Sequence, residues 1–240
     1  MKIDATNMHF QKLNELVRDT ADCDVCIQNC IGQRYIGSGL SGKQIKIDGT
    51  PGNALGSYLD GSTITVLGNA QDATGDTMNS GSITIYGNTG DAAGYAMRGG
   101  AIYVRGDAGY RAGIHMKEYK EKVPALVVGG RCGSFLGEYQ AGGVIIVLGL
   151  GYEGQPVVGN FCGTGMHGGK IYLRTETLPA DLPAQVSAAP ATPEDLKDIA
   201  AQLDAFCEKF DVEKNQILNS KFYVLRPNTK NPYKQLYVYS

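Results

Sequence analysis

The sequence lacks tryptophan, and it has no long uninterrupted apolar run. No segment reaches the roughly 18 apolar residues that a membrane-spanning helix needs. The first residues, MKIDATNMHFQKLNELVR, also lack the apolar h-region of a secretory signal. We therefore expect neither a membrane span nor a signal peptide, and we predict a cytoplasmic protein.

The sequence also lacks an excess of positive or negative charge. The chain has 22 basic and 24 acidic residues, a net charge of -2, and no extended run of either sign. Nucleic acids and anionic membranes are bound through basic patches, so the sequence predicts neither as a partner. The chain has only 6 cysteines among 240 residues. Without a secretion signal they are expected to be reduced thiols rather than disulfides.

Glycine, in contrast, is abundant, with 33 residues in a regular arrangement. The glycines that end apolar runs are Gly49, Gly68, Gly87 and Gly106, each 19 residues after the last, then Gly130 and Gly149. A second column in the same register contains Gly37, Gly56, Gly75, Gly94 and Gly113, followed by Gly137 and Gly163. A fixed spacing of this kind indicates an internal repeat.

Three apolar columns accompany the glycines. The first is Ile45, Ile64, Ile83, Ile102, Leu126, Ile145 and Ile171. The second, two residues further on, is Ile47, Val66, Ile85, Val104, Val128, Val147 and Leu173. The third is Leu40, Leu59, Met78, Met97, Met116, Gln140 and Met166, apolar except at Gln140.

Apolar and polar residues alternate within each unit, as expected for a strand with one buried face. Units that bury one face each must stack on one another to complete a core. The sequence therefore predicts an all-β fold, a right-handed single-stranded parallel β-helix of about seven to eight coils of about 19 residues.

The two ends of the chain depart from the repeat. We expect an N-terminal helix and cap over residues 1–25, the β-helix over 26–176, a Pro/Ala linker over 177–192, and a C-terminal helix with an aromatic tail over 193–240. The N-terminal helix places Phe10, Leu13, Leu16 and Val17 on one face after an Asn7 cap.

The C-terminal helix is expected to begin at a Thr192 cap, with Pro193 in its first turn. Its apolar stripe contains Leu196, Ile199, Leu203 and Phe206. The closing segment KFYVLRPNTKNPYKQLYVYS contains two apolar-aromatic runs. It either seals the last coil or docks on a partner.

Two groups of residues are weak metal candidates. Cys23, Cys26 and Cys30 resemble part of an iron–sulfur site, but they supply three of the four thiolates that such clusters commonly use. Counting back 19 residues from Ile45 reaches Cys26, which predicts instead that Cys26 is a core residue.

Asp72 and Asp91 form the second group. They share a column about one strand spacing apart, which would suit a cation or a carboxylate pair. Asn53 and Tyr110 continue that column, as at a solvated corner. His115 and His167 fall in different columns on non-adjacent coils and are not expected to form a pair. We thus expect no catalytic, cofactor-binding or metal site in this chain.

The repeat GSTITVLGNAQDATGDTMNSGSITIYGNTGDAAGYAMRGGAIYVRGDAGYRAGIHM, preceded by GQRYIGSGLSG and followed by GMHGGKIYLR, resembles the GXGXG β-helix domain of the glutamate synthase large (alpha) subunit. The resemblance covers roughly residues 26–174. A related β-helix is found in one of the subunits of formylmethanofuran dehydrogenase, whose coils carry similar glycine and methionine columns. The repeat alone does not separate these two families.

The resemblance implies a stand-alone form of this domain, one piece of a glutamate synthase assembled from separate chains. In that family the amidotransferase nucleophile, the FMN site and the iron–sulfur cluster lie in other domains. The expected partners are therefore a glutamine amidotransferase subunit and an FMN and iron–sulfur synthase subunit. No cofactor is expected in this chain. A homo-oligomer is also compatible with the sequence.

Three functions follow as hypotheses. The first is a non-catalytic structural subunit of a glutamate synthase-like complex. The second is the equivalent scaffold in a formylmethanofuran dehydrogenase-like or other glutamate-linked complex. The third is an independent β-helix enzyme acting on carbohydrate, which would need clustered carboxylates and aromatic platforms. The insertions at residues 117–125 and 151–156 interrupt the repeat and are the expected partner contacts.

Overall fold

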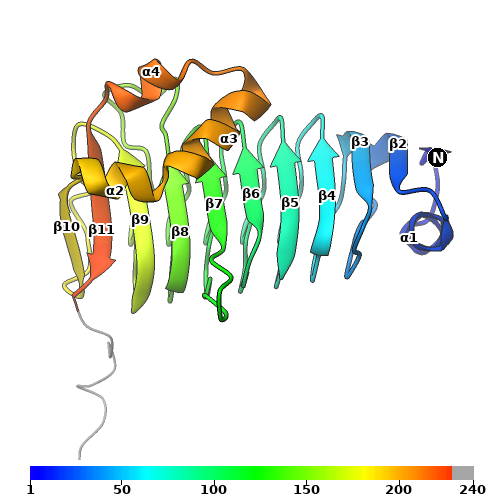
Figure 1. Ribbon diagram of the computed structural model, residues 1–240, viewed down its shortest axis with the longest axis horizontal. Helices are drawn as coiled ribbons and strands as arrows, with labels where there is room; N and C mark the ends of the chain where they lie inside the picture. Colours follow the sequence, from blue (N-terminus) through cyan, green and yellow to red (C-terminus); the bar gives the residue numbers. More distant parts are fainter. Residues whose placement is uncertain (229–240) are drawn as a thin grey trace, which may run out of the picture.

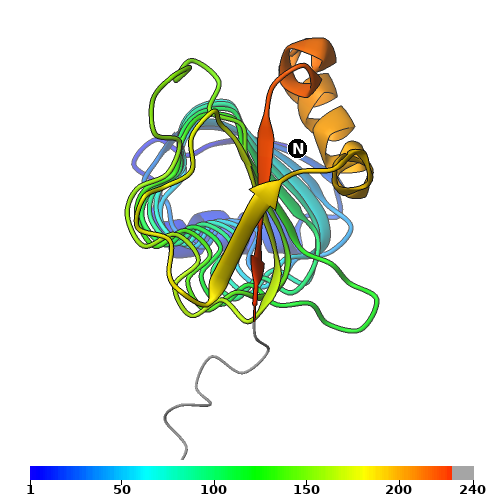
Figure 2. The same ribbon diagram turned by 90° about the vertical axis from the view of Figure 1, so that its left-hand side faces the viewer.

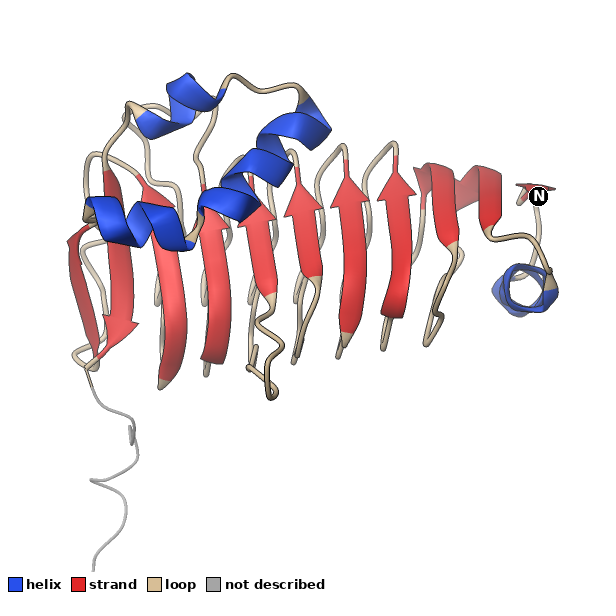
Figure 3. Ribbon diagram, in the orientation of Figure 1, coloured by secondary structure: helices blue, strands red, loops and turns tan. Residues whose placement is uncertain are grey.

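The computed structural model describes residues 1–228. In this part of the chain eleven strands form one sheet, accompanied by four helices (Figures 1 and 3). The strands are β1 (Lys2–Asp4), β2 (Asp24–Ile31), β3 (Gln44–Thr50), β4 (Asp60–Val66), β5 (Ser80–Ile85), β6 (Ala101–Val104), β7 (Ala125–Val128), β8 (Ala141–Val147), β9 (Gly168–Arg174), β10 (Val186–Pro190) and β11 (Phe222–Pro227). The helices are α1 (Phe10–Asp19), α2 (Pro193–Asp198), α3 (Ala200–Phe210) and α4 (Lys214–Leu218). The predicted all-β character is confirmed.

Strands β1 to β9 lie side by side in sequence order and are parallel. From β3 to β6 the register advances by the predicted 19 residues, pairing Ile45 with Ile64, Ile64 with Ile83, and Ile83 with Ile102. We call one circuit of the chain, from a strand to the next, a coil. A second ladder of bridges joins Ala70, Thr89, Ala108, Cys132 and Val158 on another side of the coils. Seen along the stack, the coils nearly superimpose (Figure 2).

The predicted apolar columns form the core. Ile64, Ile83 and Ile102 are fully buried, as are Met78 and Met97 of the third column. Burial of each such side chain contributes roughly 1.5–3 kcal/mol. Gln140 occupies the same column and is also buried, and its amide nitrogen donates to the carbonyl oxygens of Gly142 and Gly143 at 3.2 and 3.1 Å. These bonds compensate in part for a polar side chain among methionines.

The corner that carries the second glycine column has an unusual backbone. Within one coil, Ala92, Gly94 and Ala96 have φ values of 55°, 71° and 49°, so every second residue is left-handed. The amide of Ala92 donates to Tyr110 in the next coil, whereas that of Gly94 donates to Thr74 in the preceding coil. The alternation thus directs backbone hydrogen bonds in both directions along the stack. The sequence predicts the glycine in this corner but not its two left-handed neighbours.

The N-terminus differs from the prediction in two respects. Helix α1 begins at Phe10 and is capped by His9, whereas Asn7, the predicted cap, lies outside the helix with φ 54°. Strand β1 precedes the helix and pairs in parallel with β2. The apolar face is confirmed in part, since Leu13 and Val17 are buried.

The C-terminal segment folds back on the stack. Thr192 caps α2 as predicted and forms a reciprocal capping box with Asp195, but the helix is interrupted at Ile199, where α3 begins. The expected linker includes β10, which the repeat does not predict. β11 pairs with β9 in the antiparallel sense, and β10 pairs with β11 at the edge of the sheet. The first aromatic run of the tail therefore seals the last parallel strand, and the second run lies outside the described residues.

Among the described residues, no helix has the length and apolar character needed to cross a bilayer. Helices α2 to α4 instead lie along the outer face of the sheet at its C-terminal half (Figure 1). This arrangement leaves the outer face of β1 to β4 without a cover from α2 to α4, whereas Thr84 of β5 is already buried.

Candidate partner-binding surface

One row of side chains crosses the outer face of the sheet and changes character along the stack. Strand pairing places the row in the order Lys2, Cys26, Lys46, Thr65, Thr84, Tyr103, Val127, Ile146 and Tyr172. The members up to Thr84 are polar or contain sulfur, and those from Tyr103 onward are buried in an outer apolar cluster. The change coincides with the place where the C-terminal helices begin to cover the sheet.

Helix α3 covers the apolar half. Its residues Leu203, Phe206 and Phe210 are buried in the same cluster as Val127 and Ile146. The rings of Phe206 and Phe210 lie 4.8 Å apart. This outer cluster is a second apolar core, separate from the one inside the coils.

Two ion pairs hold α2 against the sheet beside the outer apolar cluster. Asp195 binds Arg226 of β11, and Lys170 of β9 binds Asp198 at 2.5 Å. Hydrogen bonds from the backbone and side chain of Thr192, together with Arg226, hold the pKa of Asp195 below its ordinary value. The helical segment is thus connected to the sheet at its N-terminal end by charged groups and along α3 by apolar contacts.

Tyr86 marks the boundary between the covered and uncovered halves. Its hydroxyl donates to the carbonyl oxygen of Lys209 at 2.9 Å, and its ring contacts that of Phe210 edge to face at 5.3 Å. The last turn of α3 therefore ends against β5.

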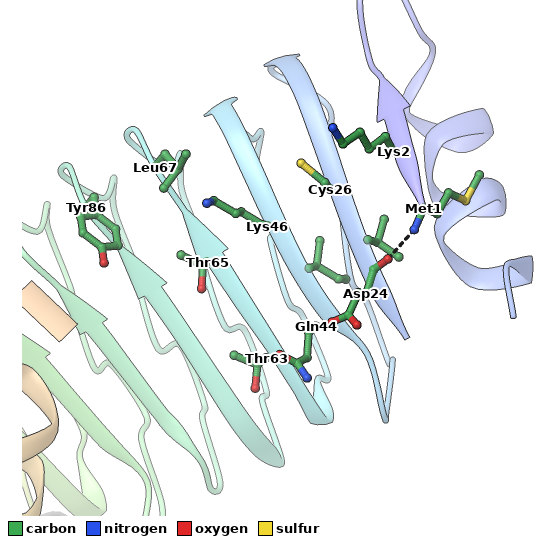
Figure 4. A pocket seen from close by; sticks show the side chains of 12 residues that line it. Met1, Lys2, Asp24, Cys26, Gln44, Lys46, Thr63, Thr65, Leu67 and Tyr86 are labelled. Atoms are coloured by element: carbon green, nitrogen blue, oxygen red, sulfur yellow. Dashed lines mark hydrogen bonds between the residues drawn. The ribbon is translucent and has the colours of Figure 1, made fainter. Parts of the chain in front are cut away.

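An open groove of about 760 Å³ lies beyond this boundary (Figure 4). It is lined by Met1, Lys2, Asp24, Val25, Cys26, Gln44, Ile45, Lys46, Thr63, Thr65, Leu67 and Tyr86. These residues belong to β1–β4 or lie directly beside β1, β4 and β5 in the chain. We call this surface the outer groove.

The charges of the outer groove are predominantly positive. The N-terminal ammonium group is engaged, because it donates to the Asp24 carbonyl oxygen at 2.6 Å and pairs with the Asp22 carboxylate at 2.9 Å. Within residues 1–228, neither Lys2 nor Lys46 has a carboxylate partner. Both lysines are exposed and lie on either side of Cys26 (Figure 4). They give the groove two positive charges without an ion pair, whereas Asp24 is the one acidic residue among those that line it.

The three N-terminal cysteines lie in different environments. Cys23 is exposed, Cys26 is half-buried on the outer face, and Cys30 is buried. The thiol of Cys30 donates to Oε1 of Gln33 at 3.3 Å, and burial raises its pKa to about 11. Among the described residues, no group of three or more His, Cys, Asp and Glu side chains is placed to hold a metal ion.

The prediction that Cys26 is a core residue is wrong. Val25, rather than Cys26, pairs with Ile45, and Cys26 pairs with the outward Lys46. The first coil contains an extra residue, visible as a register shift between Ile27 and Cys30 with φ 55° at Asn29. A one-residue shift exchanges the two faces of a strand.

Asp72 and Asp91 do lie in one column, as the repeat predicts. Oδ1 of Asp72 accepts a hydrogen bond from the backbone of Asp91 at 2.9 Å, and Oδ1 of Asp91 accepts one from the backbone of Tyr110 at 2.8 Å. Asn69, Asn88 and Asp107 make the same contact in a neighbouring column. Contacts between successive coils therefore explain why acidic and amide side chains recur at these positions.

Comparison with known proteins identifies the family. A family model described as the GXGXG motif matches residues 10–229. The chain belongs to the GXGXG family. The match extends beyond the repeat and includes α1 and the helices that cover the outer face.

Two individual proteins resemble this GXGXG chain. An uncharacterised protein, MJ1350, of Methanocaldococcus jannaschii is 45% identical over 248 residues, covering 98% of this chain and 95% of the relative. A chain in the crystal structure of the formyltransferase/hydrolase complex (FhcABCD) of Methylorubrum extorquens, in complex with methylofuran, aligns with a TM-score of 0.62 and 19% identity. That alignment covers 92% of this chain and 88% of the other and establishes similarity of fold.

The two histidines of the GXGXG chain's corner region lie apart. The ring of His115 stacks on Tyr139 at 5.2 Å and contacts Tyr95 edge to face at 5.9 Å. His167 instead approaches the carbonyl oxygen of Gly165 with Nδ1 at 3.1 Å. The repeat did not by itself predict this aromatic stack, although His115 and Tyr139 occupy the same position, two residues after the corner glycine, in successive coils.

The two insertions of the GXGXG chain differ in how they fold. The segment 117–125 stands out from the stack (Figure 2), and its Tyr119 and Val123 are each 50% exposed. In the segment 151–156, the hydroxyl of Tyr152 donates to Asp107 at 2.8 Å. The guanidinium group of Arg131 lies 4.6 Å from the centre of the Tyr152 ring. The first insertion therefore presents apolar side chains outward, whereas Tyr152 holds the second against the two preceding coils.

Proposed function

We propose that this chain is a non-catalytic assembly subunit of a multi-subunit, glutamate synthase-like complex. The observation that carries the proposal is the GXGXG family match over residues 10–229, which spans the stack together with its covering helices. In this proposal the stack is a right-handed parallel β-helix over residues 26–176. The partners are a glutamine amidotransferase subunit and a synthase subunit that holds FMN and an iron–sulfur cluster.

The physical properties of the stack suit this role. Strand pairing joins each coil to its neighbours, so the molecule is an elongated stack with repeating outer surfaces. Polar side chains in the repeat, such as Asp72 and Asp91, form hydrogen bonds between coils. The surfaces that depart from the repeat are the outer groove and the segment 117–125. These are the proposed contacts for other subunits.

A second candidate is a scaffold subunit of a formylmethanofuran dehydrogenase-like complex. The observation that favours it is the similarity of fold to a chain of the formyltransferase/hydrolase complex. Both candidates assign the chain to a multi-subunit assembly and differ in the identity of the partners.

Purification of the tagged protein from the cytoplasmic fraction of its native cells separates the candidates. Recovery with an amidotransferase and a subunit containing flavin and iron would support the glutamate synthase-like complex. Recovery with formyltransferase or hydrolase subunits would support the second candidate. Recovery of the chain alone, without flavin or iron, would refute both.

A further inference from the structure

The outer groove occupies the part of the sheet that this chain's own helices leave uncovered. We propose that it binds an acidic amphipathic helix of a partner subunit, which lies across β1 to β4 beyond the end of α3. The inference rests on the proposed role as an assembly subunit and identifies the surface and the chemistry of one contact.

Helix α3 shows how this sheet receives a helix. It crosses the strands on their outer face and places apolar side chains on the row that contains Val127 and Ile146 (Figure 1). It ends against Tyr86, which remains 38% exposed. Leu67 occupies the equivalent position in the preceding coil and is 44% exposed. Tyr86 and Leu67 thus extend the apolar path of α3 into the groove. A second helix placed there would continue an interface that already exists within the chain.

The charges specify what the second helix carries. Lys2 and Lys46 are separated by two strand spacings, about 9.6 Å. Carboxylates seven residues apart on a helix, which is nearly two turns, are separated by about 10.5 Å of rise. An acidic helix lying across the strands would therefore place one carboxylate near each lysine. Its apolar face would meet Leu67 and Tyr86.

Site-specific cross-linking tests the location. A photoreactive amino acid replaces Leu67 in the groove, and in the matched control it replaces Tyr110, which is 54% exposed and lies outside the groove. The cross-linked peptide in the purified native complex is then identified by mass spectrometry. The Leu67 probe is expected to capture an acidic, amphipathic segment of one subunit. Capture of a second copy of this chain, of a segment without acidic residues, or of nothing would overturn the inference.

Charge reversal tests the chemistry. The double variant Lys2→Glu/Lys46→Glu is expected to weaken retention of that subunit about tenfold, with a smaller effect at high salt. Arg98→Glu is the control, because Arg98 is exposed and does not line the groove. Unchanged retention in the double variant, or an equal loss in the control, would contradict the inference. Thermal unfolding of each variant verifies that it is folded.

The two levels of the proposal fail in different ways. If the unmodified chain co-purifies with no other subunit, the assembly role itself is refuted. If subunits co-purify, but the Leu67 probe cross-links to none of them and charge reversal leaves their retention unchanged, the assembly role stands. The outer groove is then not the contact.

Discussion

The carboxylate of Asp91 accepts a hydrogen bond from the backbone amide of Tyr110, 19 residues later, at 2.8 Å. Asp72 makes the same bond to Asp91 itself. Side chains of one coil therefore satisfy backbone donors of the next. A repeat that is visible as a sequence column thus acts as a physical link between coils.

Removal of this link is expected to destabilise the stack. Asp91→Ala should lower the free energy of unfolding by about 1 kcal/mol, because the amide of Tyr110 loses its acceptor. Asp91→Asn keeps an acceptor oxygen and should cost distinctly less. Chemical denaturation of the two variants measures the difference, and equal losses would show that the carboxylate charge, rather than the hydrogen bond, matters.

Replacement of a glycine by alanine should cost the most stability where the added Cβ would overlap a neighbouring atom. In Gly75→Ala the new Cβ would lie 2.4 Å from Cδ1 of Ile102, at a residue with φ +71°. We expect a loss of about 2–4 kcal/mol from the combined overlap and backbone strain. Gly151→Ala is the control, since it has a similar φ of +82° and no atom within 4 Å of the new Cβ. Its loss should be about 1–2 kcal/mol, from strain alone.

A double variant separates the two contributions at Gly75. Ile102→Val removes Cδ1, the atom that the alanine would meet. The combination Gly75→Ala/Ile102→Val should therefore be more stable than the sum of the two single losses predicts. Simple additivity in denaturant unfolding would rule out the steric contact as the cause.

Acid should loosen the helical cover of the sheet. The pKa of Asp195 is lowered in the folded protein, chiefly by the backbone hydrogen bond from Thr192. A carboxyl group with a lowered folded pKa adds stability above its ordinary pKa of 3.8, and this stability is lost as the pH falls through the lowered value. The protection of residues 193–210 from hydrogen exchange, measured relative to the intrinsic rate at each pH, should therefore fall below about pH 4. In Asp195→Asn this acid-dependent loss of protection should be smaller, and an unchanged pH profile would exclude Asp195 as the group responsible.

Thiol reactivity should follow the orientation of the cysteines. Burial raises the pKa of Cys162 to about 12 and that of Cys132 well above its ordinary value. Alkylation of the native protein at pH 8, followed by mass spectrometry, should modify Cys23 and Cys26 first and leave Cys30, Cys132 and Cys162 protected. Early modification of Cys30 together with slow modification of Cys26 would contradict the observed register of β2.

The sequence predicted the stacked strands well because the core columns are strictly aliphatic and recur at a fixed interval. It failed where one residue was added, as before Cys30, since the count from Ile45 then placed the wrong side chain inside. It also missed β1 and β10. These short edge strands depend on partners distant in sequence, which no local pattern reveals.

The outer groove was not predictable from the repeat alone. Its existence depends on where α3 stops, and the contact of Tyr86 with Phe210 joins residues 124 positions apart in the chain. A partial signal was nevertheless present. The outward row changes from Thr65 and Thr84 to Tyr103, Val127 and Ile146, which indicates that a second layer covers the sheet from β6 onward.

The 19-residue register means that the length of this molecule is set by the number of its coils. Since successive coils are related by a nearly constant step, adding or deleting one whole repeat would change the distance between the two ends by about 4.8 Å. The remaining coils would keep their own neighbours and hydrogen bonds. Evolution of such a chain can therefore adjust the separation of whatever is attached to its ends in fixed increments, without redesigning its interior.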